Sequence, residues 1–290
     1  MSDTTKHPLQ ASPATWLREA IEAERPLQVV GAVNAYAAKL AERAGFRALY
    51  LSGAGVANHS LGLPDLGVIQ LGDVLVDAAR ITVATRLPLV VDIDTGWGHA
   101  FTIERAVREL ERAGAAAVQI EDQAGAKRCG HRPGKEIVDA PEMVARLHAA
   151  VAARMDMLIV ARTDAGTADE AVERSVAYER AGADVIFPEA LQTLDDYARV
   201  VGAVNVPVLA NITEFGVTPL FTRDELRDAG VAIVLYPLSA SRAAARASER
   251  VYEAIRRDGT QQGVLEQMQT RDELYDVLDY LRFERTLDEL

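Results

Sequence analysis

Four acidic residues of this sequence could together hold a divalent cation: Asp65, Asp92, Asp94 and Glu121. Asp92 and Asp94 stand two positions apart in "VDIDTGWG". Because a strand has a side-chain period of two, both carboxylates are expected to face the same way. Two like charges that close need a compensating cation or a shared proton. The five histidines have no ligand-like spacing. The acids therefore predict a hard ion, Mg²⁺ or Mn²⁺, and argue against zinc.

A second set of residues could bind a carboxylate. It combines the fork-shaped donors of arginine with neutral donors: Arg128, Arg132, Arg162, Ser52, Asn211 and Thr213. Arginine pairs with carboxylates through two parallel hydrogen bonds. A metal on one side and such donors on the other indicate a polycarboxylate or a 2-oxo acid as ligand. The alternative is that Arg162 serves as a structural counter-ion of Asp164 and Glu189.

The only cysteine, Cys129, stands in the cationic, glycine-containing stretch "GAKRCGHRPGK". Cationic neighbours favour a thiolate, so Cys129 is expected to be reactive. The glycines suggest a mobile lid over an active site. From the residues alone, Cys129 could be a nucleophile with His131 as its base, a redox sensor, or a proton donor.

These groups need a scaffold, and the sequence predicts one. Eight short apolar runs alternate with helix-like segments: 27–33, 48–53, 87–94, 115–122, 157–164, 184–190, 206–213 and 231–238. Such strands are typical of a buried parallel sheet. We expect a (β/α)8 TIM-type barrel; a doubly wound open sheet is the alternative, but no G-x-G-x-x-G follows the first run.

The polar candidates cluster where a barrel builds its active site. The C-terminal ends of the runs carry acids, amides, hydroxyls or an arginine, whereas their starts and middles are apolar. Active sites of (β/α)8 barrels lie at these ends. The spacing of the candidates along the chain therefore predicts that they meet at one mouth.

The chain continues for over fifty residues after the last run. We expect one domain over 1–290 with a C-terminal helical extension over about 240–290. Its apolar positions, among them Leu274, Leu278 and Leu281, must pack either on a neighbouring subunit or on the chain's own barrel.

Composition excludes several classes of protein. The net charge of −12 argues against a nucleic-acid partner. No apolar run is long enough to span a membrane, and the first twenty residues contain no secretion-signal core. One cysteine suits a reducing compartment. We expect a cytoplasmic protein.

The chain resembles the isocitrate lyase and phosphoenolpyruvate mutase superfamily, most specifically its 2-methylisocitrate lyases. The resemblance rests on "KRCGH" and on blocks in order along nearly the whole chain, such as "SLGLPDLG", "VDIDTGWG", "ARTDA", "LANITEFGVTPLFT" and "MQTRDELY". It implies a barrel of this type, assembled as a homotetramer whose extra C-terminal helices are swapped between subunits. It also implies the cleavage of the tricarboxylate 2-methylisocitrate to pyruvate and succinate, in the methylcitrate cycle of propionate catabolism.

The resemblance also implies a site. Mg²⁺ would be held directly by Asp92 and Asp94, and through water by Asp65 and Glu121. The expected catalytic residues are Cys129 as general acid, Arg162, Glu121 and His131. Substrate contacts are expected from Tyr50, Ser52, Gly53, Ala54, Cys129, Gly130, His131, Arg162, Glu189, Asn211, Ile212, Thr213, Arg242 and Arg271. Phe187 and Leu235 are expected to set specificity beside the substrate methyl group.

Other functions stay open on sequence alone. Isocitrate lyase is the nearest rival, although those enzymes are generally much longer. Oxaloacetate decarboxylase and phosphonopyruvate hydrolase share the metal acids but generally lack the whole "KRCGH" segment. A silent barrel that binds dicarboxylates, or senses oxidants through Cys129, is the alternative from a different class.

Overall fold

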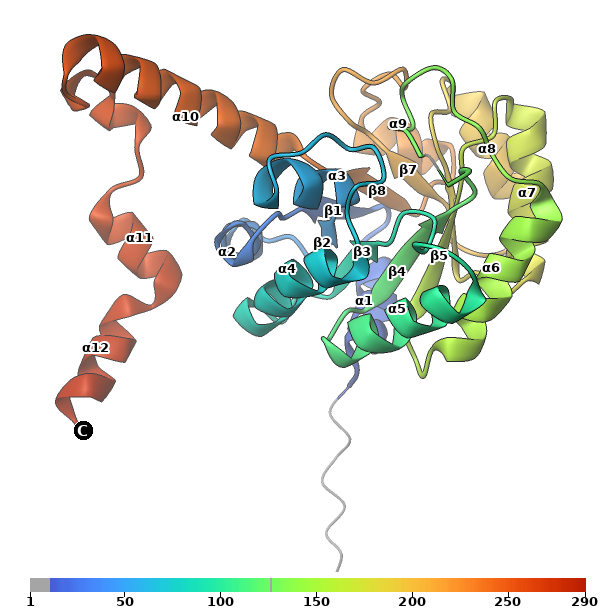
Figure 1. Ribbon diagram of the computed structural model, residues 1–290, viewed down its shortest axis with the longest axis horizontal. Coiled ribbons are helices and arrows are strands. Elements are labelled where there is room, and N and C mark those ends of the chain that lie inside the picture. Colours follow the sequence, from blue (N-terminus) through green and yellow to red (C-terminus); the bar gives the residue numbers. More distant parts are fainter. Residues whose placement is uncertain (1–10, 126) are drawn as a thin grey trace, which may run out of the picture.

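The computed structural model describes residues 11–125 and 127–290. Its centre is a sheet of eight parallel strands, in the order β6-β5-β4-β3-β2-β1-β8-β7 (Figure 1). The strands are β1 (Leu27–Gly31), β2 (Ala48–Leu51), β3 (Leu89–Asp92), β4 (Ala117–Glu121), β5 (Leu158–Thr163), β6 (Val185–Pro188), β7 (Leu209–Asn211) and β8 (Ile233–Tyr236). A parallel bridge from Ile186 to Val208 joins β6 to β7. The expected barrel is confirmed, and it is nearly closed.

Helices alternate with these strands. They are α1 (Pro13–Ala23), α2 (Ala35–Arg43), α3 (Gly53–Gly55), the π-helix η1 (Val56–Ser60), α4 (Leu71–Ala84), α5 (Ala100–Arg112), α6 (Ala140–Ala153), α7 (Ala168–Arg180), α8 (Leu194–Ala203), α9 (Arg223–Asp228), α10 (Ser239–Asp258), the 3₁₀ helix η2 (Gln262–Gln267), α11 (Arg271–Leu278) and α12 (Tyr280–Asp288). Among the described residues, no helix has the length and apolarity to cross a membrane. Residues 1–10, part of the segment where no secretion signal is expected, lie outside the described residues.

Local sequence determines where these helices begin and end. Threonine hydroxyls cap α7, α8, α9 and α11 by accepting the N–H of the third helical residue. Such a cap contributes about 1 kcal/mol. Glycines follow α5 and α7: Gly114 and Gly182 have left-handed conformations, with φ of 89° and 98°, which end each helix.

The apolar core has two layers because alternate strand residues point inward and outward. The outer layer packs the strands against the surrounding helices. The inner layer fills the barrel and includes Tyr50, Phe187 and Leu235. Leu17 and Ile21 of α1 belong to this inner layer. Arg18 of α1 pairs with Asp156 just before β5, so α1 closes the N-terminal end of the barrel.

The last helices leave the barrel. In Figure 1, α10 extends away from β8, and α11 and α12 run downward from its far end at the left of the view. Of these two helices, α11 touches the barrel at α2, where Arg43 pairs with Asp276 at 2.8 Å. In a closed (β/α)8 barrel a helix after the last strand would cover β8 and β1.

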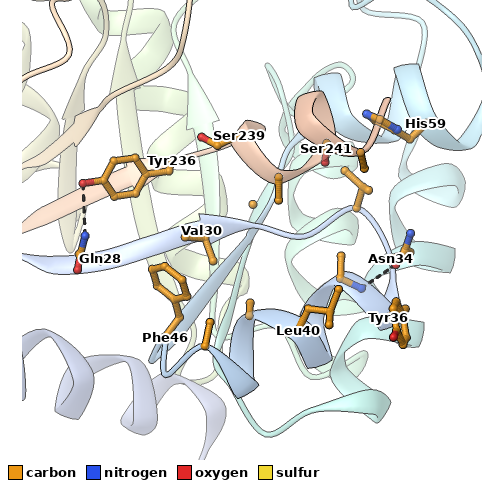
Figure 2. A pocket seen from close by; sticks show the side chains of 17 residues that line it. Gln28, Val30, Asn34, Tyr36, Leu40, Phe46, His59, Tyr236, Ser239 and Ser241 are labelled. Carbon is orange, nitrogen blue, oxygen red and sulfur yellow. Dashed lines mark hydrogen bonds between the residues drawn. The ribbon is translucent and has the colours of Figure 1, made fainter. Parts of the chain in front are cut away.

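A groove of about 760 Å³ lies where that covering helix is missing. Figure 2 shows Val30 of β1, Tyr236 of β8, Leu40 of α2 and Phe46 around it. Gln28 and Tyr236 are joined by a hydrogen bond at its edge. The lining is mostly apolar, and no helix within residues 11–125 and 127–290 covers this part of the barrel wall.

Candidate functional site

Asp92 and Asp94 lie together at the C-terminal end of β3. Asp92 Oδ2 accepts a 3.0 Å hydrogen bond from the Gly53 N–H. A Cβ on Gly53 would lie 2.9 Å from Asp94 Oδ1, so glycine allows the close approach. The strand ends at Asp92, and Asp94 has a left-handed backbone with φ of 50°. The two carboxylates are close as expected, but a turn and not the strand period places Asp94.

Both Asp94 and Glu121 are costly to ionise in the absence of a cation. Burial, followed by the negative charge of Asp92, raises the pKa of Asp94 to about 7. Burial raises the pKa of Glu121 to about 8, against the opposing effect of Arg162. Asp94 Oδ2 and Glu121 Oε1 are buried and accept no hydrogen bond from the described residues. A cation between these groups would favour their ionised forms.

The donor set fits a hard ion that keeps its waters. Within residues 11–125 and 127–290, no three His, Cys, Asp or Glu side chains are grouped closely enough to hold a metal unaided. Zinc sites use three or four protein ligands, whereas Mg²⁺ is often held by one or two carboxylates plus waters. Asp92 and Asp94 match the second pattern. Asp65 is close by, because Lys127 Nζ lies 2.6 Å from Asp94 and 2.8 Å from Asp65.

Arg162 is the central cation of the mouth. Its Nε and Nη2 donate to the two oxygens of Asp164 at 2.9 and 3.0 Å. Nη1 lies 3.3 Å from Glu121, and Nε lies 3.5 Å from Glu189. Burial alone would lower the pKa of Arg162, but these acids, Asp164 first, raise it above its usual value. The guanidinium therefore stays charged, and its centre lies 5.3 Å from the Phe187 ring.

The basic segment after β4 closes over this mouth. Its two ends pair through an antiparallel bridge between Gln123 and Ile137. Three basic residues of the segment, spaced by four, each contact an acid from a different strand end. Lys127 contacts Asp94 after β3, His131 lies 2.8 Å from Glu189 after β6, and Lys135 lies 3.0 Å from Asp164 after β5. The cationic composition of the loop thus matches an acidic ring below it. We call residues 127–135 the lid.

Cys129 and Gly130 lie at the part of the lid nearest to Arg162. A Cβ on Gly130 would lie 2.5 Å from both Arg162 Nη2 and Glu189 Cγ, so no larger residue fits there. Cys129 is exposed and lines the pocket beneath the lid. The thiol is therefore within the mouth and remains accessible.

The His131 ring contacts groups other than the thiol. Nδ1 accepts a 3.2 Å hydrogen bond from the Val217 N–H, which leaves a ring proton for Nε2 beside Glu189. Burial alone would raise the pKa of Glu189, but Arg162 and then His131 hold it below its usual value. His131 thus fixes the lid to the barrel.

The remaining mouth residues are neutral donors. The Asn211 amide donates to both Glu189 oxygens at 3.2 Å. The Tyr50 hydroxyl donates to Gln119 Oε1 at 2.6 Å. Burial, followed by Asp92, raises the pKa of Tyr50 above its usual value, so this phenol stays protonated.

These groups enclose a pocket of about 360 Å³. Of the residues expected from sequence, the structure places the following around it: Tyr50, Ser52, Ala54, Asp65, Asp92, Cys129, Gly130, His131, Arg162, Phe187, Glu189, Asn211, Thr213, Leu235 and Arg242. Gly53 and Asp94 adjoin Asp92, Glu121 adjoins Arg162, and Ile212 is buried between Asn211 and Thr213. Arg271 begins α11 and does not line the pocket of its own chain.

Sequence reasoning missed five lining residues: Asn58, Pro64, Lys127, Pro237 and Leu238. Arg128 lines the pocket, as expected from sequence, whereas Arg132 is not one of its lining residues. Lys127 stands within "KRCGH", so its position beside Arg128 and Cys129 was the available signal. Asn58 lies in the π-helix η1, and nothing in its local sequence predicts that it reaches the pocket.

The chain is similar to known enzymes over nearly its whole length. The family model for phosphoenolpyruvate phosphomutase matches residues 17–256. The 2-methylisocitrate lyase of Salmonella typhimurium is 56% identical over 285 residues, which cover 96% of this chain and 97% of that protein.

Two solved structures have the same fold. The crystal structure of 2,3-dimethylmalate lyase is 34% identical, covers 96% of this chain and 95% of its own, and superposes with a TM-score of 0.88. Phosphonopyruvate hydrolase in complex with oxalate and Mg²⁺ is 31% identical, covers 95% and 98%, and has a TM-score of 0.82.

Proposed function

The chain belongs to the phosphoenolpyruvate phosphomutase family and is a carbon–carbon lyase, and we propose that it cleaves 2-methylisocitrate to pyruvate and succinate. The observation that carries this proposal is the lid, which brings Cys129 to a pocket formed by Arg162 and the metal acids. The similarity to 2-methylisocitrate lyase over nearly the full chain supports the substrate. The reaction would serve the methylcitrate cycle of propionate catabolism.

Asp92 and Asp94 would hold Mg²⁺ directly, with Asp65 and Glu121 contributing through water; Mn²⁺ is a possible substitute. The ion would supply Lewis acidity that lowers the cost of the alkoxide charge formed from the substrate hydroxyl. The raised pKa values of Asp94 and Glu121, about 7 and 8, support a cation here. The related phosphonopyruvate hydrolase was solved with Mg²⁺.

The chain's own residues orient the substrate and stabilise charge. The reaction is a retro-aldol cleavage: the substrate hydroxyl gives up its proton to a base, its oxygen becomes the pyruvate carbonyl, and the broken carbon–carbon bond leaves its electron pair on succinate. Arg162, with the donors Asn211 and Thr213, would stabilise that charge in the adjoining carboxylate. Cys129 would then give its proton to the succinate carbon as general acid. Tyr50, a protonated phenol, would act as a hydrogen-bond donor.

Phe187 and Leu235 would form the apolar contact for the substrate methyl group. Both line the pocket and are buried in the inner core layer. A methyl group placed against them gains hydrophobic contact that isocitrate would lack, and such a difference of one methyl is worth about 1–3 kcal/mol.

We also propose a homotetramer in which α10 and the helices after it are exchanged between subunits. The apolar groove beside β1 and β8 and the departure of α10 from its own barrel support this arrangement (Figures 1 and 2). Arg271 would reach a substrate only through such an assembly, because it lies outside the pocket of its own chain.

The test is pyruvate release from racemic 2-methylisocitrate, with Mg²⁺ or with a chelator, and with isocitrate and 2,3-dimethylmalate in parallel. The proposal expects metal-dependent pyruvate from 2-methylisocitrate and little glyoxylate from isocitrate. Arg162→Lys keeps the charge but loses the paired donors, and it should reduce turnover strongly. Absence of pyruvate in the presence of metal would reject the proposed reaction.

A further inference from the structure

The His131 ring of the lid rests on a short segment after β7, residues 214–217, which we call the receiver. A Cβ on Gly216 would lie 2.8 Å from His131 Nδ1 and 3.0 Å from two ring carbons. These ring atoms are the three nearest heavy atoms to that position. The next residue, Val217, donates its N–H to Nδ1 at 3.2 Å. The receiver therefore offers His131 one hydrogen bond and a surface with no side chain.

Backbone conformation does not explain the glycine. Gly216 does not have a positive φ, so an alanine at this position would not have to adopt a left-handed backbone. The space it leaves open is the space that the His131 ring takes. The reason for glycine at this position is thus a contact with the lid and not a requirement of the turn.

The opposite edge of the ring faces the catalytic mouth. His131 Nε2 lies 2.8 Å from Glu189 Oε1, and the His131 side chain is 8% exposed. Glu189 in turn lies 3.5 Å from Arg162. The ring is held between the receiver and Glu189, and Cys129 lies two residues before it. A shift of His131 would therefore move Cys129 relative to Arg162.

The receiver is itself tied to the start of α10. Glu214 accepts a hydrogen bond from the Ser239 hydroxyl and lies 3.7 Å from Arg242. Arg242 also lies over the Phe215 ring, 5.6 Å from its centre. Ser239 and Arg242 both belong to the first turn of α10. The receiver is thus braced by the helix that leaves the barrel.

We propose that Gly216 is a positioning residue, which holds the lid closed by accommodating His131 and so places Cys129 over Arg162. This assignment builds on the proposed lyase reaction for its effect on turnover, while the closure itself is a property of the free protein. Glu214 supports the same contact from the side of α10.

The experiment compares Gly216→Ala with Gly166→Ala, His131→Ala and the double variant Gly216→Ala/His131→Ala. Gly166 is a matched control, since it follows β5 at the same end of the barrel and a Cβ there meets nothing within 4 Å. Lid opening is measured on the ligand-free full chain as the rate of trypsin cleavage after Lys127, Arg128 and Lys135. Pyruvate release gives kcat and KM, and thermal unfolding confirms that each variant is folded.

Gly216→Ala should raise the cleavage rate by roughly tenfold and lower kcat by roughly tenfold to a hundredfold, because a small misplacement of a catalytic group is costly. Gly166→Ala should resemble wild type. In the His131→Ala background, adding Gly216→Ala should change neither the trypsin cleavage rate nor kcat, because the ring that the new methyl group would contact is absent.

Two results would overturn the proposal. One is a trypsin cleavage rate of the lid that is the same in Gly216→Ala as in wild type. The other is a double variant in which Gly216→Ala changes the cleavage rate and kcat by the same factors as it does in wild type. A wild-type protein that makes no pyruvate would reject the lyase reaction instead, and the cleavage rates would still decide whether Gly216 holds the lid.

Discussion

The mouth and the groove of this molecule differ in what covers them. The mouth, about 360 Å³, is lined by charged and polar groups, and the chain covers it with its own lid through Lys127, His131 and Lys135. The groove beside β1 and β8, about 760 Å³, is mostly apolar and is left open by the part of the chain that the structure describes. Ion pairs depend on the placement of individual charged groups, whereas an apolar wall can be completed by any apolar surface of complementary shape.

The largest effect should come from the thiol at the mouth. Cys129→Ser replaces the proposed acid with a much weaker one of similar size, and turnover should fall by about 10²–10⁴-fold. Binding of succinate in the presence of pyruvate, measured by calorimetry, should persist because the pocket keeps its shape. Turnover that is unchanged would remove Cys129 from the mechanism and leave the lid as a cover only.

A charge in the groove should change assembly and leave the mouth intact. Leu40→Glu places a carboxylate on the groove wall of α2, and burying it against a second copy would be costly. Light scattering should show the mass falling toward the 31.4 kDa of one chain. The matched control is Val83→Glu, on the exposed face of α4, which should leave the mass unchanged. Equal masses for both variants would exclude the groove as an interface.

Acid should remove the stabilising contribution of two carboxylates of the mouth, Asp164 and Glu189. Arg162 holds the pKa values of Asp164 and Glu189 below their usual range, despite burial. Groups with a depressed folded pKa stabilise the protein above their unfolded values of about 4, and this contribution is lost as the pH falls through the folded pKa. The groove lining contains no Asp or Glu.

The measurement is the free energy of unfolding in urea between pH 6 and pH 3. The wild-type value minus the value of Asp164→Asn should shrink as the pH falls, because only the wild type has the Asp164 carboxylate. Asp94 and Glu121 have raised pKa values, which favour the folded state as the pH falls, but both proteins contain them and they drop out of this difference. Identical slopes in both proteins would contradict the ion-pair contribution of Asp164.

The smallest effect concerns the wall behind the mouth. The Tyr178 hydroxyl donates to Asp122 Oδ2 at 2.7 Å, and Asp122 Oδ1 accepts the N–H of Asp164 at 2.8 Å. Tyr178→Phe should lower stability by about 1 kcal/mol and Tm by about 2–4 °C. Tyr197 is equally buried, but its hydroxyl has no hydrogen-bond partner among the described residues. Calorimetry should therefore find Tyr197→Phe close to wild type; equal losses would assign both effects to packing.

The sequence predicted the barrel and most of the mouth because the end of each strand can be recognised from the change from apolar to polar residues. Apolar runs that finish in acids, amides or arginine place Asp92, Arg162, Glu189 and Asn211 at one end of a parallel sheet. The turn that brings Asp94 back toward Gly53 depends on a left-handed backbone at a residue other than glycine, which local propensity does not reveal.

Contacts between distant segments were the other part that the sequence did not predict. The pairing of Lys127 with Asp65 and Asp94, and of His131 with the receiver, joins residues far apart in the chain. The direction of α10 could not be read either, because an amphipathic helix does not indicate which surface it covers.

The position of α1 determines from which end of the barrel substrate can enter and products can leave. Leu17 and Ile21 fill the N-terminal end of the barrel, in the same inner layer as Tyr50 and Phe187. The barrel is thus open at one end only, and that end is the one under the lid. In the proposed reaction, 2-methylisocitrate enters and both pyruvate and succinate leave through this one opening, so the lid must open between successive turnovers. The rate of opening then sets an upper limit on turnover, however fast the bond is broken.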